Sequence, residues 1–205
     1  MNDSCRAILF DLGGVVITLS FQQAYRRWAE ISGLPVDEVR ARFKVDAEYE
    51  RYEKGLIDTG SYIDHVSELM GHRFDPVEFK QAWNDVFVGT ADGIEQLLAR
   101  LHRGRLLLAL TNTNPLHYEA WANRFDGALR HFDEIYCSFE IGARKPEPEA
   151  FAFVLRAHGL DPGQVLFIDD GPANVASAEA CGIRSILAKD GLDLTRELSK
   201  YGVNV

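Results

Sequence analysis

The stretch AILFDLGG, from Ala7 to Gly14, joins four apolar residues to an aspartate and a pair of glycines. A short apolar run bounded by turn residues is typical of a buried strand, and the glycines predict a tight turn directly after it. In open parallel sheets, ligands bind beyond the carboxyl ends of the strands. The carboxylate of Asp11 therefore stands where such a sheet would carry its chemistry.

Four more short apolar runs predict further strands, at residues 106–110, 135–137, 165–168 and 185–188. Helical patterns separate them: one begins at Asn114-Pro115, and another begins at Pro172 and would be ended by Gly182. Strands that alternate with helices indicate βαβ units. The fold class predicted from this order is α/β, with a mainly parallel, doubly wound sheet.

Residues from about 20 to 87 interrupt the alternation, because they contain no convincing strand and several amphipathic helical patterns. Ser20-Phe-Gln-Gln23 and Asp75-Pro-Val-Glu78 both fit the capping box that starts a helix. Aromatic residues at helical spacing, such as Trp28 and Trp83, favour the core of a small bundle. We therefore expect an α/β core of residues 1–17 and 90–205, an inserted helical cap at 18–89, and hinges near residues 16–20 and 89–92.

Composition and charge exclude several classes of function. The 205 residues carry 31 acidic and 22 basic side chains, a net charge of −9, which disfavours nucleic acid and anionic membranes as partners. The apolar runs are too short to span a membrane, and the run after Met1 to Arg6 is too short for a signal peptide. The three cysteines are far apart and indicate neither disulfides nor a zinc site. A cytoplasmic protein is expected, and no pattern indicates an oligomeric state.

Polar residues follow three of the predicted strands, and a lysine precedes a predicted helix: Asp11, Thr111-Asn112, Asp169-Asp170 and Lys145. Each alone has an ordinary explanation as a turn or surface residue, although adjacent carboxylates repel each other unless a cation or donors compensate. Together they offer an anionic nucleophile, a cation site, a hydroxyl with amide donors, and an ammonium group. This set suits phosphoryl transfer, whose transition state spreads negative charge over three oxygens.

A carboxylate approaches a phosphate dianion only if their repulsion is cancelled. Mg²⁺, which proteins hold through carboxylates, waters and the substrate phosphate, would cancel it, and Lys145 would supply a second positive charge. The residues therefore predict an enzyme that hydrolyses a small phosphorylated molecule with Mg²⁺. Asp11 would form a covalent aspartyl-phosphate.

The four motifs resemble those of the haloacid dehalogenase superfamily over essentially the whole chain. Residues 10–16 (FDLGGVV), 110–114 (LTNTN), 144–147 (RKPE) and 167–174 (FIDDGPAN) are similar to its four motifs in order, and the helical insertion matches its cap in position. Further segments, including Tyr52-Glu-Lys-Gly55, resemble the bacterial α-D-glucose-1-phosphate phosphatase group. The resemblance implies a Rossmann-like core and a phosphatase acting on a sugar phosphate such as a hexose 1-phosphate.

The resemblance also implies a role for each motif. Asp11 would attack phosphorus, Thr111 and the backbone of Asn112 would bind a phosphoryl oxygen, and Lys145 would neutralise nucleophile and phosphate. The metal ligands implied are Asp11, the backbone carbonyl of Gly13, Asp170 directly and Asp169 through water, with Asn174 supporting the metal loop.

Gly13 departs from the family pattern, in which most phosphatases carry a second aspartate there as general acid and base. Loss of a positioned acid costs ~10²–10⁴-fold in rate, most for strongly basic leaving groups, so Gly13 favours anomeric or other activated phosphates. We hypothesise that a replacement acid comes from Asp46, Glu50, Glu53 or His117.

Three alternatives compete with the phosphatase. Gly13 is compatible with a metal-independent 2-haloacid dehalogenase, but that reaction has no use for the Asp169-Asp170 pair. A non-catalytic phospholigand-binding protein is compatible with a missing acid, but would have little reason to hold Thr111 and Lys145 as well. A signalling receiver domain would carry its acidic pair at the first strand and no helical insertion.

Overall fold

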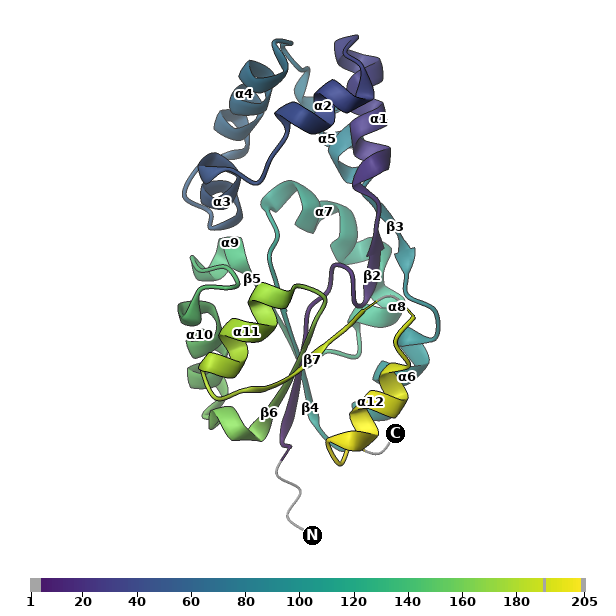
Figure 1. The fold of residues 1–205 in the computed structure, drawn as a ribbon, viewed down its shortest axis with the longest axis vertical. Helices are drawn as coiled ribbons and strands as arrows, with labels where there is room; N and C mark the ends of the chain where they lie inside the picture. Colours follow the sequence, from purple (N-terminus) through teal and green to yellow (C-terminus); the bar gives the residue numbers. More distant parts are fainter. Residues whose placement is uncertain (1–4, 190, 204–205) are drawn as a thin grey trace.

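The computed structural model describes residues 5–189 and 191–203, and its centre is a five-stranded parallel sheet in the order β5-β4-β1-β6-β7 (Figure 1). The strands are β1 (Ala7–Phe10), β4 (Leu106–Thr111), β5 (Glu134–Cys137), β6 (Val165–Asp169) and β7 (Arg184–Leu187). All five predicted strands form, with ends within one residue of the expected ones. The doubly wound α/β fold class is confirmed.

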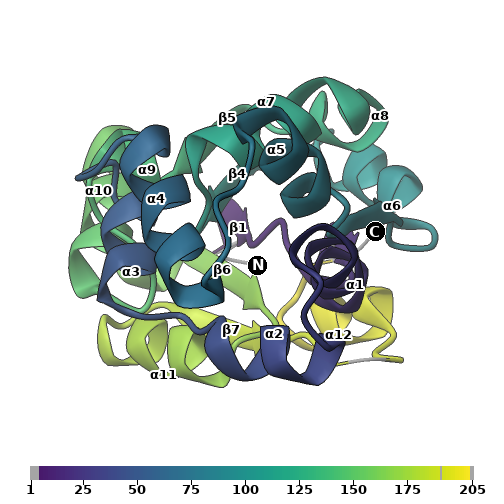
Figure 2. The same cartoon turned by 90° about the horizontal axis from the view of Figure 1, so that it is seen from above.

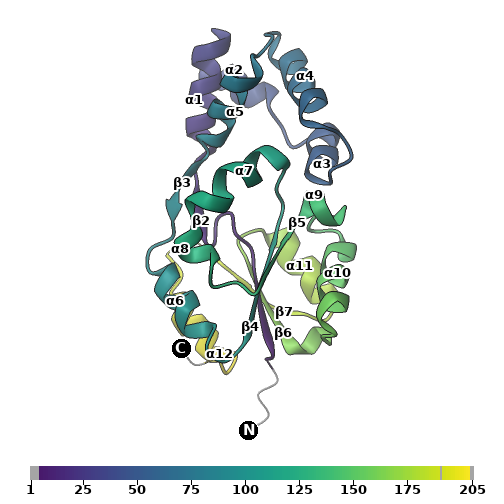
Figure 3. The same ribbon diagram turned by 180° about the vertical axis from the view of Figure 1, so that it is seen from behind.

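Helices cover both faces of this sheet (Figure 3). Side chains alternate between the two faces along a strand, so this cover buries every residue of β1. Ile8 and Phe10 point into a hydrophobic cluster that includes residues of α6 (Ile94–Leu101), α7 (Pro115–Arg124), α8 (Asp126–Leu129) and α12 (Leu194–Lys200). Ala7 and Leu9 point into a second cluster with α10 (Pro148–His158) and α11 (Pro172–Ala180). The short helix α9 (Ser138–Ile141) follows β5, and a 3-10 turn (Pro162–Gln164) precedes β6.

Residues 21–84 form a helical bundle that lies above the carboxyl edge of the sheet (Figures 1 and 2). Its helices are α1 (Phe21–Ser32), α2 (Val36–Arg42), α3 (Ala47–Glu53), α4 (Thr59–Met70) and α5 (Pro76–Asn84). Its core is aromatic: Trp28 stacks on Phe79 with ring centroids 5.4 Å apart, and Tyr52 stacks on Tyr62 at 4.4 Å. The prediction that these aromatic residues form a bundle core is confirmed.

The two predicted capping boxes have different outcomes. Asp75 starts α5, because its carboxylate accepts hydrogen bonds from the backbone N–H groups of Val77 (2.9 Å) and Glu78 (3.2 Å). Ser20 does precede α1 as its N-cap residue, but the predicted capping box does not form, because the Ser20 side chain makes no capping hydrogen bond. The backbone of Ser20 is held elsewhere, since its N–H donates to the carbonyl of Val86 at 2.7 Å.

Two short strands between the core and the helical bundle are absent from the sequence-based expectation. β2 (Ile17–Leu19) and β3 (Phe87–Thr90) pair antiparallel, with Ile17 opposite Thr90 and Thr18 opposite Gly89. Runs this short carry too little periodicity to be told from loop, and their pairing joins segments far apart in the chain. They coincide with the expected hinges; the hinge roles and the cap boundaries stay predictions.

Within residues 5–189 and 191–203, no helix combines the length and apolar character needed to cross a membrane. The prediction that the amino-terminal residues do not form a signal peptide includes residues 1–4, which lie outside the described part of the chain.

Candidate active site

Three neighbouring strands bring their polar residues to one edge of the sheet. Asp11 follows β1 directly, Thr111 ends β4 and Asp169 ends β6, and the register pairs Phe10 with Ala109 on one side and with Ile168 on the other. The backbone N–H of Asp11 continues the ladder by donating to the carbonyl of Ile168 at 2.8 Å. The candidate nucleophile is therefore held by the central strand of the sheet.

The side chain of Lys145 is buried at this edge of the sheet, although a lysine is ordinarily a surface residue. Its side chain is 0% exposed, and its Nζ lies 2.9 Å from Asp11 Oδ1 and 2.6 Å from Asp169 Oδ2. Burial alone would lower the pKa of Lys145, but the charges of Asp11 and Asp169 outweigh it and raise that pKa above its usual value. Lys145 is therefore a fixed positive charge between the ends of β1 and β6.

The side-chain amide of Asn112 makes two hydrogen bonds to the backbone of Lys145. The Asn112 Nδ2 donates to the Lys145 carbonyl, and the Lys145 N–H donates to Asn112 Oδ1, each at 2.8 Å. The next residue, Thr113, is tied to Ser138 by a backbone N–H to hydroxyl bond of 2.9 Å and a hydroxyl to carbonyl bond of 3.0 Å. The side chain of Asn112 is thus occupied, and phosphate binding by its backbone stays a prediction.

Three carboxylates meet beside Lys145, where a metal ion could be held. Asp11, Asp169 and Asp170 each place one carboxylate oxygen so that all three atoms lie within 4.8 Å of one another. With all three ionised, one ammonium group leaves two negative charges in excess, which a divalent cation would neutralise. Oxygen ligands clustered in this way fit Mg²⁺.

Asp169 has both oxygens engaged by protein donors. Its Oδ2 accepts from Lys145, and its Oδ1 accepts from the backbone N–H of Gly171 at 2.7 Å and from Asn174 Nδ2 at 2.9 Å. Asp170, in contrast, is exposed at the edge of the site. Asn174 thus holds the Asp169 carboxylate, while direct metal binding by Asp170 and binding through water by Asp169 stay predictions.

Two glycines make room for this cluster. A Cβ at Gly14, whose φ is +78°, would lie 2.1 Å from Asp170 Oδ2, so only glycine allows this approach of the two loops. A Cβ at Gly13 would lie 2.9 Å from Leu19 Cδ1. Leu19 therefore occupies part of the space that an acidic side chain at position 13 would need.

The charges gathered at this site shift the pKa of Asp11. Burial raises its pKa most, the ion pair with Lys145 lowers it, and the charges of Asp169 and Asp170 raise it again, to about 7. Without a cation, Asp11 is therefore only partly ionised near neutral pH, and its protonated fraction cannot attack. A divalent cation at this site would favour the ionised, nucleophilic form.

These features match a known family. Residues 5–182 match the family model described as haloacid dehalogenase-like hydrolase. The chain belongs to this family.

Relatives of this hydrolase act on phosphate esters. It is 26% identical to D-ribitol-5-phosphate phosphatase of Bacteroides thetaiotaomicron, covering 94% of this chain and 96% of the relative, and 24% identical to hexitol phosphatase A of Escherichia coli, covering 94% and 87%. Its fold is similar to the crystal structure of a haloacid dehalogenase family enzyme from Bacteroides thetaiotaomicron in complex with magnesium and inorganic phosphate. That likeness has a TM-score of 0.84 and 30% identity, covering 94% of this chain and 98% of the other.

A cavity of about 60 Å³ separates the site of this hydrolase from the helical bundle. From the core it is lined by residues of the first two motifs and of α7, and from the bundle by α3: Gly13, Thr111, Asn112, His117, Tyr49 and Glu53. The cavity therefore borders the candidate active site at Gly13 and Thr111.

Of the four candidate acids, two line this cavity and two do not. Asp46 lies outside the cavity lining; it caps α3 by accepting from the Tyr49 N–H at 2.9 Å, and its other oxygen lies 2.8 Å from His65 Nε2. Glu50 also lies outside the lining and is 45% exposed. Glu53 and His117 are therefore the two candidates that line the cavity.

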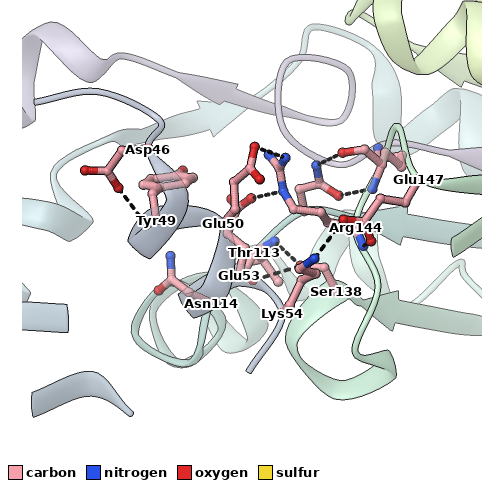
Figure 4. A network of polar contacts seen from close by, with 12 residues as sticks. Asp46, Tyr49, Glu50, Glu53, Lys54, Thr113, Asn114, Ser138, Arg144 and Glu147 are labelled. Atoms are coloured by element: carbon pink, nitrogen blue, oxygen red, sulfur yellow. Dashed lines mark hydrogen bonds and ion pairs between the residues drawn. The ribbon is translucent and has the colours of Figure 1, made fainter. Parts of the chain in front are cut away.

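The bundle is held to the core by a network of ion pairs that the sequence motifs did not reveal (Figure 4). Arg144 donates from Nε to Glu53 Oε2 at 2.9 Å and from Nη1 to Glu50 Oε1 at 3.1 Å. Lys54 of the bundle reaches back to Glu147 of the core at 2.9 Å. The network joins the end of α3 to the loop that carries Lys145. Its signal in the sequence is the spacing of Glu50 and Glu53, one turn apart on α3, with Lys54 directly after them.

Glu53 and His117 differ in what they can do with a proton. Burial raises the pKa of Glu53 above its ordinary value, although Arg144 and Lys145 act to lower it. Burial lowers the pKa of His117 to about 3, so its imidazole is uncharged at neutral pH. Of the two, Glu53 is the group suited to donate and accept a proton, and His117 is suited to hydrogen bonding.

Proposed function

We propose that this hydrolase is a Mg²⁺-dependent phosphatase that cleaves a small sugar or polyol phosphate through an aspartyl-phosphate on Asp11. The observation that carries the proposal is the buried Asp11 carboxylate, 2.9 Å from Lys145 and grouped with Asp169 and Asp170. Relatives named for ribitol 5-phosphate and hexitol phosphates, and a structural neighbour in complex with magnesium and phosphate, support the same reading. A hexose 1-phosphate is a natural first substrate to test, because its anomeric hydroxyl leaves readily.

In this proposal Asp11 attacks phosphorus, while the Thr111 hydroxyl and the Asn112 backbone bind a phosphoryl oxygen. Lys145 orients the Asp11 carboxylate and neutralises the phosphate. Asp11, the Gly13 carbonyl, Asp170 and, through water, Asp169 would hold Mg²⁺, which supplies neutralising charge when bound. Water then hydrolyses the aspartyl-phosphate, with the helical bundle at residues 18–89 acting as a cap that excludes solvent during transfer.

A screen for phosphate release tests this function against the dehalogenase alternative. With Mg²⁺, we expect release from hexose 1-phosphates, pentitol or hexitol phosphates and acyl phosphates, and loss of release when a chelator removes the metal, because the carboxylates would then repel the phosphate. The same protein should release no halide from 2-haloacids. Halide release that persists with the chelator would establish the alternative, and Mg²⁺ or phosphate binding without any release would establish the non-catalytic one.

We further propose that Glu53 transfers the proton that a residue at position 13 would otherwise handle. It lines the same cavity as Gly13, and its pKa is raised by burial. It would protonate the leaving oxygen and later accept a proton from the attacking water. The other titratable groups of the cavity fit less well, because burial raises the pKa of Tyr49 well above 10.0 and leaves His117 neutral.

Replacing Glu53 with glutamine should therefore penalise poor leaving groups selectively. We expect the ratio of kcat/KM for a polyol phosphate to that for p-nitrophenyl phosphate to fall about 10²-fold, because nitrophenolate leaves without protonation. Glu50→Gln is the matched control, since Glu50 also pairs with Arg144 but is exposed; it should leave the ratio unchanged. Equal losses with both substrates in Glu53→Gln would mean that Glu53 acts only through its ion pair with Arg144.

A further inference from the structure

His117 is a buried polar side chain in apolar surroundings. It lies in the first turn of α7, is 8% exposed, and packs against Trp83 and Phe87 with ring centroids 5.1 and 5.0 Å away. Its imidazole is uncharged, so one ring nitrogen carries a hydrogen and the other can only accept. Which nitrogen carries the hydrogen decides what the ring can bind.

Asn114 decides the tautomer. Asn114 is the N-cap of α7, and its Oδ1 accepts from the backbone N–H of His117 at 3.1 Å. Because a backbone N–H can only donate, this bond fixes the orientation of the amide and turns Nδ2 toward the ring, 3.3 Å from His117 Nδ1. An amide NH₂ can only donate as well, so Nδ1 accepts and the hydrogen of the imidazole is on Nε2.

The Nε2–H group has no hydrogen-bond partner among residues 5–189 and 191–203, although the atom is buried. A buried donor left without a partner is unfavourable, because it has given up its hydrogen bonds to water. The side chain lines the cavity that is also lined by Gly13 and Thr111, whose 60 Å³ gives room for about four to six waters at 10–15 Å³ each. A ligand oxygen that reached Nε2 from this cavity would find a donor already oriented by the fold.

We propose that the Nε2–H of His117 binds an oxygen substituent of the leaving group and so selects hydroxylated phosphate esters, such as polyol and sugar phosphates. The inference rests on the proposed phosphatase function, because it identifies the cavity with the leaving-group site. A leaving group without such an oxygen would keep the donor buried and unpaired, which is how a polar site rejects an apolar analogue. His117 is thus a specificity residue, distinct from Glu53, which handles the proton.

The first test is His117→Phe, which keeps an aromatic ring between Trp83 and Phe87 and removes the donor. The measurement is the ratio of kcat/KM for D-ribitol 5-phosphate to that for phenyl phosphate, whose leaving group bears no hydroxyl. We expect the ratio to fall about 10–100-fold, the equivalent of one lost hydrogen bond to a buried donor. A variant that folds and keeps the wild-type ratio would overturn the inference.

The second test reverses the tautomer without touching the ring. In Asn114→Asp the carboxylate can still cap α7, but it offers Nδ1 an acceptor in place of a donor, so the hydrogen moves to Nδ1 and Nε2 loses its donor. We expect ¹⁵N NMR of the imidazole to show Nε2–H in the wild type and Nδ1–H in this variant, and the substrate ratio to fall as in His117→Phe. Wild-type protein with Nδ1–H would overturn the inference.

The failure of the inference can be told from the failure of the proposed function. A wild-type protein that releases phosphate from neither substrate would overturn the phosphatase assignment and the inference with it. An active wild type whose substrate ratio stays the same in His117→Phe and in Asn114→Asp would overturn the inference alone.

Discussion

Replacing Asp11 with asparagine is expected to lower kcat for every phosphate ester by at least about 10⁴-fold. The amide keeps the shape of the side chain, but its oxygen is uncharged and a poor nucleophile, and loss of a covalent nucleophile removes most of the rate enhancement of the site. The loss should be the same for good and poor leaving groups, since both need the nucleophile. The measurement is steady-state phosphate release at saturating Mg²⁺.

Two further observations make the Asp11 result decisive. Wild-type protein quenched with acid during turnover should yield a phosphorylated peptide that contains Asp11, and Asp11→Asn should yield none. Asp64→Asn, at an exposed position of α4, is the control for a neutral replacement that should keep full activity. Phosphate release from Asp11→Asn within tenfold of the wild-type rate would rule out the aspartyl-phosphate mechanism.

Lys145→Met is expected to lower activity about 10³-fold and also to destabilise the metal-free protein by about 3–5 kcal/mol. The activity falls because the fixed positive charge on nucleophile and phosphate is lost. The stability falls because Asp11 and Asp169, 2.9 and 2.6 Å from Nζ, are left buried without their counter-ion. Mg²⁺ should in turn bind more tightly to this variant, because the carboxylates no longer share the site with an ammonium group.

Thermal unfolding with and without Mg²⁺ separates these effects. The rise in Tm on adding Mg²⁺ should be larger for Lys145→Met than for the wild type, since the metal replaces the missing charge. Lys54→Met is the matched control: Lys54 also pairs with a carboxylate, but it is 23% exposed, and such pairs contribute at most about 1 kcal/mol. A Lys145→Met protein as stable as Lys54→Met without metal would show that the buried charges do not depend on Lys145.

In the proposed roles of Gly13, Glu53 and His117, protonation and recognition of the leaving group depend on residues outside the first motif. Gly13 has no side chain to donate a proton, and Leu19 occupies part of the space beside it. Glu53 enters from the bundle and His117 from the start of α7, and both line the one cavity next to Thr111. Proton transfer and recognition of the leaving group would then both depend on the contact between bundle and core.

Local patterns in the chain were enough to predict the sheet. The five apolar runs became β1, β4, β5, β6 and β7 because each is bounded by turn residues and long enough to be buried. They could also place Asp11, Thr111 and Asp169 at one edge, since the carboxyl ends of parallel strands meet there. The patterns did not predict β2 and β3, because these strands form by pairing with each other across a long segment of the chain. They placed Ser20 correctly at the start of α1, but they could not show that its side chain makes no capping bond.

By itself, then, the sequence determined the fold class and the chemical types gathered at the strand ends, because apolar periodicity and strand-end position are local properties of the chain. Only the tertiary structure decided which of these groups are in contact and what their protonation states are. Lys145 is buried between two carboxylates. Glu53 lines the cavity, whereas Glu50 does not. The hydrogen of the His117 ring is on Nε2, because the amide group of Asn114 donates to Nδ1. Each of these outcomes depends on burial and on partners distant in the chain or across a turn, and burial sets the protonation states on which the chemistry rests.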